Sequence, residues 1–462
     1  MESRHRRACC ELPGMRYWRV LWVVLLGLGA VGVVQRLGWG HHYAHYGSYV
    51  TWGLWVSAYI YFIGLSAGAF LLSSLVYGFR MRALERVGPI ALVTAVITLF
   101  LALLSIWFDL GHMERFYYVF IRPNFRSMMA WMVWLYSAYF LLLLGELYLA
   151  VFRKASVEAV TVSLGLVDLR RLWRVAGLAL IAVLVVLIPL WTTQAHGRGW
   201  IQDEGLMAFF ALILGAVILL VWRLPAPYTL RLLGVLGIPL AVMFHGGVGA
   251  LFATVAARPY WHSPIQPVLF LTGALVSGGG LLLFVLSFVY PLPDPEKWAT
   301  LRFLSRIVGG LLALDLLLEW AEFSVPLWYG FGEEVESLRL ILFGPYWWVF
   351  WVVHLLIGSL IPLGLILWSR RVEGWGLAGL LIAVSFMAVR LNVVIPGLVT
   401  PPLRGLQEAF MDRRLQFGYV PSLHEWLVVA FIVTLGLGLF YGACRWLHRW
   451  EGFRVHREEV EP

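Results

Sequence analysis

Residues 88–109 read GPIALVTAVITLFLALLSIWFD, an apolar stretch that ends abruptly on the carboxylate of Asp109. A helix that crosses the hydrocarbon core of a bilayer needs about 20 apolar residues. Residues 88–108 supply that length without a single charge. The stretch therefore predicts a transmembrane helix, and Asp109 predicts where this helix meets one membrane surface.

Similar apolar runs recur along the chain and are separated mostly by short connections. This pattern predicts an all-α fold, a polytopic membrane helix bundle with about twelve transmembrane helices. The runs span residues 17–35, 49–79, 88–108, 127–152, 174–193, 205–222, 229–256, 265–290, 302–321, 345–369, 374–396 and 424–446.

The runs fall into groups that predict the organisation of the chain. An Arg-rich tail precedes the first run, as in a signal peptide, but no small-x-small cleavage site follows it, so we expect a retained signal anchor from Tyr17 to about Val34. We expect a tail at 1–16, a first bundle at 17–152, an extra hairpin with linkers at 153–228, a second bundle with the C-terminal helices at 229–446 and a tail at 447–462.

Composition excludes several classes of protein. With 61% hydrophobic and 13% charged residues, the chain is neither a soluble globular domain nor disordered. The net charge of +9 does not indicate a nucleic-acid partner, because the arginines punctuate apolar runs and form no basic face. The three cysteines, Cys9, Cys10 and Cys444, are too few for a four-thiolate iron–sulfur cluster.

The distribution of basic residues predicts the orientation in the membrane. Most of the 35 Lys and Arg residues lie in connections on the same side as the N-terminal tail. Basic residues are enriched in cytoplasmic connections. We therefore expect both termini in the cytoplasm, which places Asp109 at the outer surface.

Ionisable residues inside the apolar runs are the strongest indicators of function. Each costs about 2.5–3.5 kcal/mol on insertion scales, so such residues usually serve proton relays, ligand sites or buried ion pairs. Asp315 and Glu319 are four residues apart and share one helix face with Glu322. The residues expected to transfer protons are Glu146, Asp315, Glu319 and His354.

Other patterns have competing interpretations. His41, His42 and His45 lack a visible fourth zinc ligand, and we expect interfacial histidines near a proton-coupled site. Residues 64–68, GLSAG, match a nucleophile elbow, but within a helix in lipid they predict a small-residue packing face.

Two alternative functions follow from the buried ionisable residues. His245 and His354 are a possible axial pair for the haem of a b-type cytochrome. An ion or solute transporter would also place charges within the membrane.

Several motifs, in their order, resemble those of the NrfD-type family, the membrane subunits of polysulfide reductase. The later motifs are similar to the longer subgroup, which includes membrane subunits of hydrogenase-2, the Dsr sulfur-metabolism complex and alternative complex III. The motifs are Asp109-Leu-Gly-x-x-x-Arg115, Trp52-Gly-Leu-Trp55 with residues 64–68, Pro123-Asn-Phe125 with Met129-Ala-Trp131, Trp261-His-Ser-Pro264, Ala274 to Gly278, Arg390 to Gly397 and Tyr419 to Trp426.

The resemblance implies a quinone-interacting subunit of a multi-subunit respiratory oxidoreductase in a prokaryotic cytoplasmic (inner) membrane. Its substrate would be menaquinone or ubiquinone, and it would have no haem or iron–sulfur cluster of its own. Electrons would pass to or from a ferredoxin-like iron–sulfur subunit on the outer face, joined by a molybdopterin or other catalytic subunit. The hairpin at 174–222 looks additional to the ten-helix core of the longer subgroup.

A quinone head group exchanges two electrons and two protons, so its site needs aromatic walls and titratable hydrogen-bonding groups. We expect Asp109 and His112 to handle the proton, and Arg390 to orient a carbonyl or to pair with Asp109. The other residues expected at the quinone are His245, Tyr419, Glu425 and Arg115, and no metal site is expected.

Overall fold

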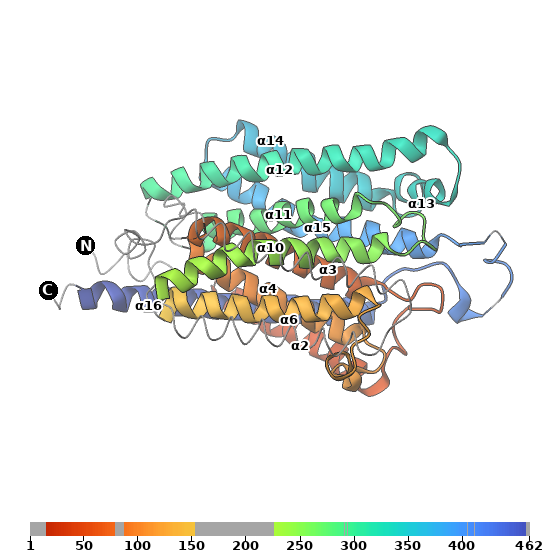
Figure 1. Ribbon diagram of the computed structural model, residues 1–462, viewed down its shortest axis with the longest axis horizontal. Helices are drawn as coiled ribbons and strands as arrows, with labels where there is room; N and C mark the ends of the chain where they lie inside the picture. The colour runs from red at the N-terminus through yellow and green to blue at the C-terminus, as the bar shows by residue number, and fades with distance from the viewer. Residues whose placement is uncertain are drawn as a thin grey trace.

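The computed structural model describes residues 15–78, 87–152, 226–290, 292, 294–403, 405–410 and 412–458. These residues form a bundle of long helices that run side by side (Figure 1), and they contain no strand. The expected hairpin at 174–193 and 205–222 lies outside the described residues.

The helices of the described part follow the apolar runs. In chain order they are α2 (Met15–Trp39), α3 (Leu54–Tyr77), α4 (Gly88–Asp109), η3 (Met113–Arg115), α5 (Tyr118–Ile121), α6 (Met128–Leu147), η4 (Tyr148–Phe152), α10 (Ala226–Ala253), α11 (Gln266–Phe284), η6 (Val285–Val289), α12 (Asp294–Tyr329), α13 (Glu333–Leu342), η7 (Val349–Leu360), α14 (Ile361–Trp368), α15 (Val372–Val399), η8 (Arg413–Leu415) and α16 (Leu423–Glu458).

Within the described ranges, nine helices are long and apolar enough to cross a membrane, and each coincides with an expected run. The expected run at 302–321 lies within α12, a helix of 36 residues that is not among these nine. At 1.5 Å per residue α12 is about 54 Å long, more than the about 30 Å of a hydrocarbon core. The all-α polytopic fold is confirmed, and the chain is an integral multi-pass membrane protein.

One boundary differs from the expected run at 49–79, because α3 begins only at Leu54. Gly47 N–H donates to the Val50 carbonyl at 3.0 Å, which closes a turn ahead of the helix. The apolar residues of this turn are thus not helical. Residues 40–53 form a loop that carries His41 and Tyr46 across the helix ends.

Small residues allow α3 and α11 to pack closely. A Cβ on Gly68 would overlap the Ala274 carbonyl, and a Cβ on Gly278 would lie 2.6 Å from the Cα of Gly68. Close approach through small residues is how membrane helices gain dispersion contacts. The packing interpretation of residues 64–68 is therefore confirmed for Gly68.

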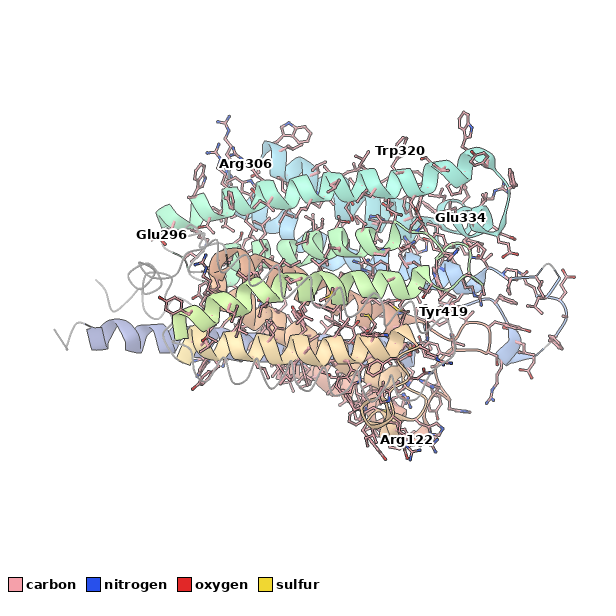
Figure 2. The ribbon with its side chains drawn as sticks, viewed as in Figure 1. Arg122, Glu296, Arg306, Trp320, Glu334 and Tyr419 are labelled. Atoms are coloured by element: carbon pink, nitrogen blue, oxygen red, sulfur yellow. The ribbon has the colours of Figure 1, made fainter. Side chains whose placement is uncertain are left out.

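The two ends of the bundle carry different connections. Figure 2 shows Tyr419 and Glu334 at one end, with Arg122 near the same end, and Glu296 and Arg306 toward the other. We call the first of these the Tyr419 end. Helices α2, α4, α10 and α15 finish there, and α3, α11 and α16 begin there (Figure 1).

Candidate functional site

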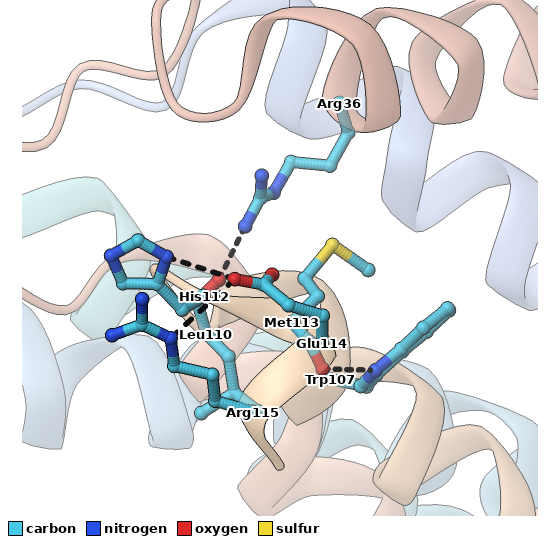
Figure 3. A network of polar contacts seen from close by, with 7 residues as sticks. All are labelled: Arg36, Trp107, Leu110, His112, Met113, Glu114 and Arg115. Carbon is cyan, nitrogen blue, oxygen red and sulfur yellow. Dashed lines mark hydrogen bonds and ion pairs between the residues drawn. The ribbon is translucent and has the colours of Figure 1, made fainter.

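Arg36, in the last turn of α2, is buried against the end of α4. Its Nε donates to the Phe108 carbonyl at 2.7 Å, and its Nη2 donates to the Leu110 carbonyl at 2.5 Å, the second bond being drawn in Figure 3. The last carbonyls of a helix have no partner inside it, and a guanidinium supplies several donors. Arg36 therefore holds a positive charge against the residues on both sides of Asp109.

Asp109 is the last residue of α4, and the charges that act on it come from Arg36 and Glu425. The Tyr46 hydroxyl is a closer influence on this carboxyl than either charge, because it lies within reach of a hydrogen bond to it although the two do not meet in good hydrogen-bond geometry. The Oδ1 atom of Asp109, the Tyr46 hydroxyl and His41 Nε2 are buried and have no hydrogen-bond partner among the described residues. A carboxylate, a phenol and an imidazole with free hydrogen-bonding capacity thus gather at one place.

Aromatic rings form the wall beside these polar atoms. The ring centroid of His41 lies 5.4 Å from that of Tyr46 and 5.7 Å from that of Trp55. His424 also lies 5.7 Å from Trp55, and its Nδ1 is 3.1 Å from Oε1 of Gln35. Its Nε2 has no partner in the described part of the chain. We call Arg36, His41, Tyr46, Asp109 and His424 the Asp109 cluster.

The protonation of two members follows from their surroundings. Burial, followed by the charge of Arg36, lowers the pKa of His41 to about 4, so this imidazole is neutral at neutral pH. Burial and the carboxylate of Asp109 raise the pKa of Tyr46 well above its usual value. The phenol therefore keeps its proton and remains a hydrogen-bond donor.

Glu425, at the start of α16, is fully buried, and the groups around it already satisfy its carboxylate. Its Oε1 accepts from the His45 N–H at 2.9 Å and from the Ser422 N–H and Oγ–H at 3.2 and 3.1 Å. The Tyr419 hydroxyl donates to its Oε2 and accepts from the Leu54 N–H at 2.8 Å. Burial and then the Glu425 charge raise the pKa of Tyr419. This pair ties the loops to α16 and α3.

A second group of ionisable residues lies deeper in the bundle. Arg390 and His245 precede the ends of α15 and α10 by about 12–14 Å of helix. The Arg390 guanidinium lies 4.7 Å from the Phe270 ring centroid, and Asp315 is the carboxylate that acts on it. Asp315 accepts a 2.6 Å hydrogen bond from Thr272.

His354 and Glu319 complete this deeper group. His354 Nε2 lies 3.5 Å from Oε2 of Glu319, which is on α12. His354 is in the π-helical segment η7, and such irregular segments are frequent at functional sites. Both ring nitrogens of His245 lack a partner among the described residues. A Cβ on Gly64 would lie 3.7 Å from both His245 and Arg390, so this glycine leaves space between them. We call His245, Asp315, Glu319, His354 and Arg390 the Arg390 cluster.

The structure groups the expected site residues differently from the sequence analysis. The expected pair of Asp109 and Arg390 is not found, because Arg36 is the cation at Asp109 and Asp315 is the carboxylate at Arg390. His245 lies with Arg390, which acts on it electrostatically, and not with Asp109. The reason is depth, since Asp109 ends its helix whereas Arg390 lies well inside its own.

Three more expected residues lie outside both clusters. After Asp109 the backbone becomes extended at Leu110, and His112 and Arg115 turn into solvent around the exposed Glu114 (Figure 3). The His112 Nδ1–Glu114 Oε1 distance is 3.0 Å. Glu146 is fully buried in α6, and neither of its oxygens has a partner in the described residues.

Sequence reasoning missed Arg36 as a site residue. Arg36 follows an apolar run, where a basic residue is common and marks no site. Its partners Phe108 and Leu110 are more than 70 positions away, so no local pattern identifies them. In the sequence, only the grouping of His41 with His42 and His45 made His41 a candidate site residue. In the structure, His41 lies beside the Asp109 backbone and the Trp55 ring.

The fold and these clusters define an integral membrane protein with ionisable groups buried at two depths. The family model for polysulphide reductase, NrfD, matches residues 43–402, and the chain belongs to this family.

Named relatives include a selenate reductase component of Mesobacillus selenatarsenatis, which is 32% identical over 94% of this chain and 97% of its own length. The Hdr-like menaquinol oxidoreductase integral membrane subunit of Archaeoglobus fulgidus is 26% identical over 84% of this chain and 82% of its own. Protein NrfD of Escherichia coli is 24% identical over 70% of this chain and 87% of its own.

Proposed function

We propose that this chain is the quinone-interacting membrane subunit of a multi-subunit oxidoreductase, and that the Asp109 cluster binds the quinone head group. The observation that carries the proposal is the set of buried polar atoms without partners among the described residues. Asp109 Oδ1, the Tyr46 hydroxyl, His41 Nε2 and His424 Nε2 belong to this set. They lie beside aromatic rings at one end of a membrane bundle.

The chemistry of these residues fits a quinol. A quinol has two hydroxyl groups that must lose their protons as two electrons leave. Asp109 is an acceptor for one hydroxyl, and neutral His41 is an acceptor for the other. The reverse reaction uses the same groups, with Tyr46 donating a hydrogen bond to a quinone carbonyl. Trp55 and the imidazole rings give the planar head group flat surfaces to pack against.

The names of relatives support a quinone and a catalytic partner. One relative is named as a menaquinol oxidoreductase subunit, and another as a subunit of selenate reductase. By analogy, menaquinone or ubiquinone is the substrate here, and this chain holds no haem or iron–sulfur cluster. Electrons pass to or from a ferredoxin-like iron–sulfur subunit at the Tyr419 end, which is joined by a molybdopterin or other catalytic subunit.

The orientation proposed from the sequence indicates which side of the membrane the Tyr419 end faces. Arg302, Arg306, Arg370 and Arg371 lie in or next to connections at the opposite end, and cytoplasmic connections are rich in such residues. Both termini then face the cytoplasm of a prokaryote, and the Tyr419 end faces outward.

The Arg390 cluster and Glu146 are proposed to transfer protons within the bundle. Five ionisable side chains meet in the cluster at a depth where each is costly, and His354 and Glu319 are already within 3.5 Å of each other. Such a chain of acids and bases can exchange protons when water connects its members. The proposal extends to Glu146, whose oxygens have no protein partner in the described ranges.

Asp109→Asn in the intact complex tests the head-group site. The amide cannot accept a proton, so quinol turnover should fall by about 100-fold or more, in line with the loss of a general base. Glu114→Gln is the matched control, because Glu114 lies nearby but is exposed, and it should keep near-normal turnover. Subunit assembly is measured in parallel by native electrophoresis. Normal turnover in an assembled Asp109→Asn complex would place the site elsewhere.

A further inference from the structure

We infer that helix α2 is a working part of the quinone site, in which Arg36 is a positioning residue that fixes the backbone on both sides of Asp109 and holds a positive charge beside it. This inference rests on the proposed function of the Asp109 cluster. It also requires α2 to remain on the mature protein, whereas a first apolar run behind an Arg-rich tail is often a removable signal.

Helix α2 has an attachment that suits this role. Most of its surface faces outward, yet a Cβ on Gly29 would lie 2.6 Å from the Phe431 backbone nitrogen, and one on Gly32 would lie 2.7 Å from Leu427 Cβ. The backbones of α2 and α16 therefore approach closely. The Trp22 indole N–H adds a 2.7 Å hydrogen bond to the Thr434 carbonyl.

The end of α2 shows a sharp contrast in burial. Arg36 is 2% exposed, while Leu37 and Trp39 are 59% and 58% exposed. Apolar residues at the end of a membrane helix are expected to face outward, whereas an arginine turned into the bundle is costly and needs partners there. The neighbouring Gln35 also points inward, toward His424 Nδ1 at 3.1 Å. The last turn of α2 thus contributes polar contacts to the site.

The hydrogen bonds of Arg36 explain what it does for Asp109. They go to the carbonyls of Phe108 and Leu110, which flank Asp109 in the chain. The guanidinium therefore fixes the backbone from which the carboxylate projects, and it holds a positive charge near that carboxylate. A nearby cation favours the ionised form of a carboxylate, which is the form that accepts a proton from a quinol. Asp109 Oδ1 remains free for that proton.

The test compares three variants in the intact complex, with a short-chain naphthoquinol as the electron donor. Arg36→Gln removes the charge and should lower kcat by about tenfold or more, with KM changed by less than about threefold. Arg36→Lys keeps the charge and should recover part of kcat. Trp22→Phe removes the hydrogen bond from α2 to the Thr434 carbonyl, at the part of α2 that lies away from the site. This variant should keep kcat within about twofold, since one neutral hydrogen bond contributes little.

The outcomes distinguish the role of Arg36 from the location of the quinone site at Asp109. Equal kcat values for Arg36→Gln and Trp22→Phe would overturn the inference, as would a variant that changes KM alone. An active complex whose intact mass shows that residues 1–39 are absent would also overturn it. If Asp109→Asn is inactive while Arg36→Gln is normal, only the role of Arg36 fails. If Asp109→Asn turns over normally, the proposed site itself fails.

Discussion

Removing Arg390 should reveal that its energetic partner is Asp315 and not Asp109. Arg390→Leu leaves the buried Asp315 carboxylate facing Thr272 without its cation. Breaking one side of a buried, contacting charge pair destabilises proteins by about 3–5 kcal/mol, because the remaining charge stays desolvated. Arg390 and Asp315 act on each other through their charges without a direct ion pair, and Arg390 Nη2 has no hydrogen-bond partner among the described residues, so we expect a loss below that range. Asp315→Asn should have a comparable effect on the free energy of unfolding, since it strands the guanidinium.

The free energy of unfolding of the double variant Arg390→Leu with Asp315→Asn decides whether the two residues interact. With both charges gone, neither residue is left buried and uncompensated, so the loss should be smaller than the sum of the single losses by about 1–3 kcal/mol. The control cycle pairs Arg390→Leu with Asp109→Asn. Those residues lie in different clusters, and their effects should add to within about 0.5 kcal/mol.

Unfolding free energies are obtained by titrating the purified protein with a denaturing detergent in mixed micelles. Additive effects for Arg390 and Asp315 would refute the reasoning. Coupling between Arg390 and Asp109 would refute it equally, because it would place the two clusters in contact.

Three further predictions concern the site, the helix contact and the cofactors. The pKa of His41 in the folded protein is about 4, against an ordinary value of 6.5, so the folded state should lose stability as the pH falls from 6.5 toward 4; His41→Gln should flatten that loss in thermal melts. Gly29→Leu should push α2 away from Phe431 and lower quinol turnover, whereas Gly27→Leu, with no atom within 4 Å of its Cβ, should have little effect in the same assay. The isolated subunit should show no haem absorption and no stoichiometric iron, and a b-type spectrum would revive the haem interpretation of the two buried histidines.

The sequence predicted the helices well because the membrane imposes a simple rule. An apolar run of sufficient length becomes a helix, since no other arrangement satisfies its backbone in lipid. Differences appeared where this rule does not apply. Residues 49–53 are apolar enough to extend α3 but turn instead, and α12 extends beyond its apolar part at both ends.

The ionisable residues were found from the sequence, but their grouping was not. Because Asp109, Asp315 and Arg390 lie in or at the end of apolar runs, the sequence identifies each of them as a candidate functional residue. Their partners depend on which helices pack together and on depth along each helix, to within a turn. His112 was assigned to the site from its spacing to Asp109, and the extended backbone at Leu110 directs it into solvent instead.

The charges at the Tyr419 end indicate which carboxylate takes the quinol proton. The guanidinium of Arg36 and the carboxylate of Glu425 both act electrostatically on Asp109. Glu425 already accepts four hydrogen bonds, so a proton on either oxygen would have to displace a donor that ties a loop to the helices. Asp109 Oδ1 has no partner among the described residues, so a proton there displaces no hydrogen bond that ties a loop to the helices. We therefore expect Asp109 to carry the proton, while the hydrogen bonds to Glu425 keep the loops in place.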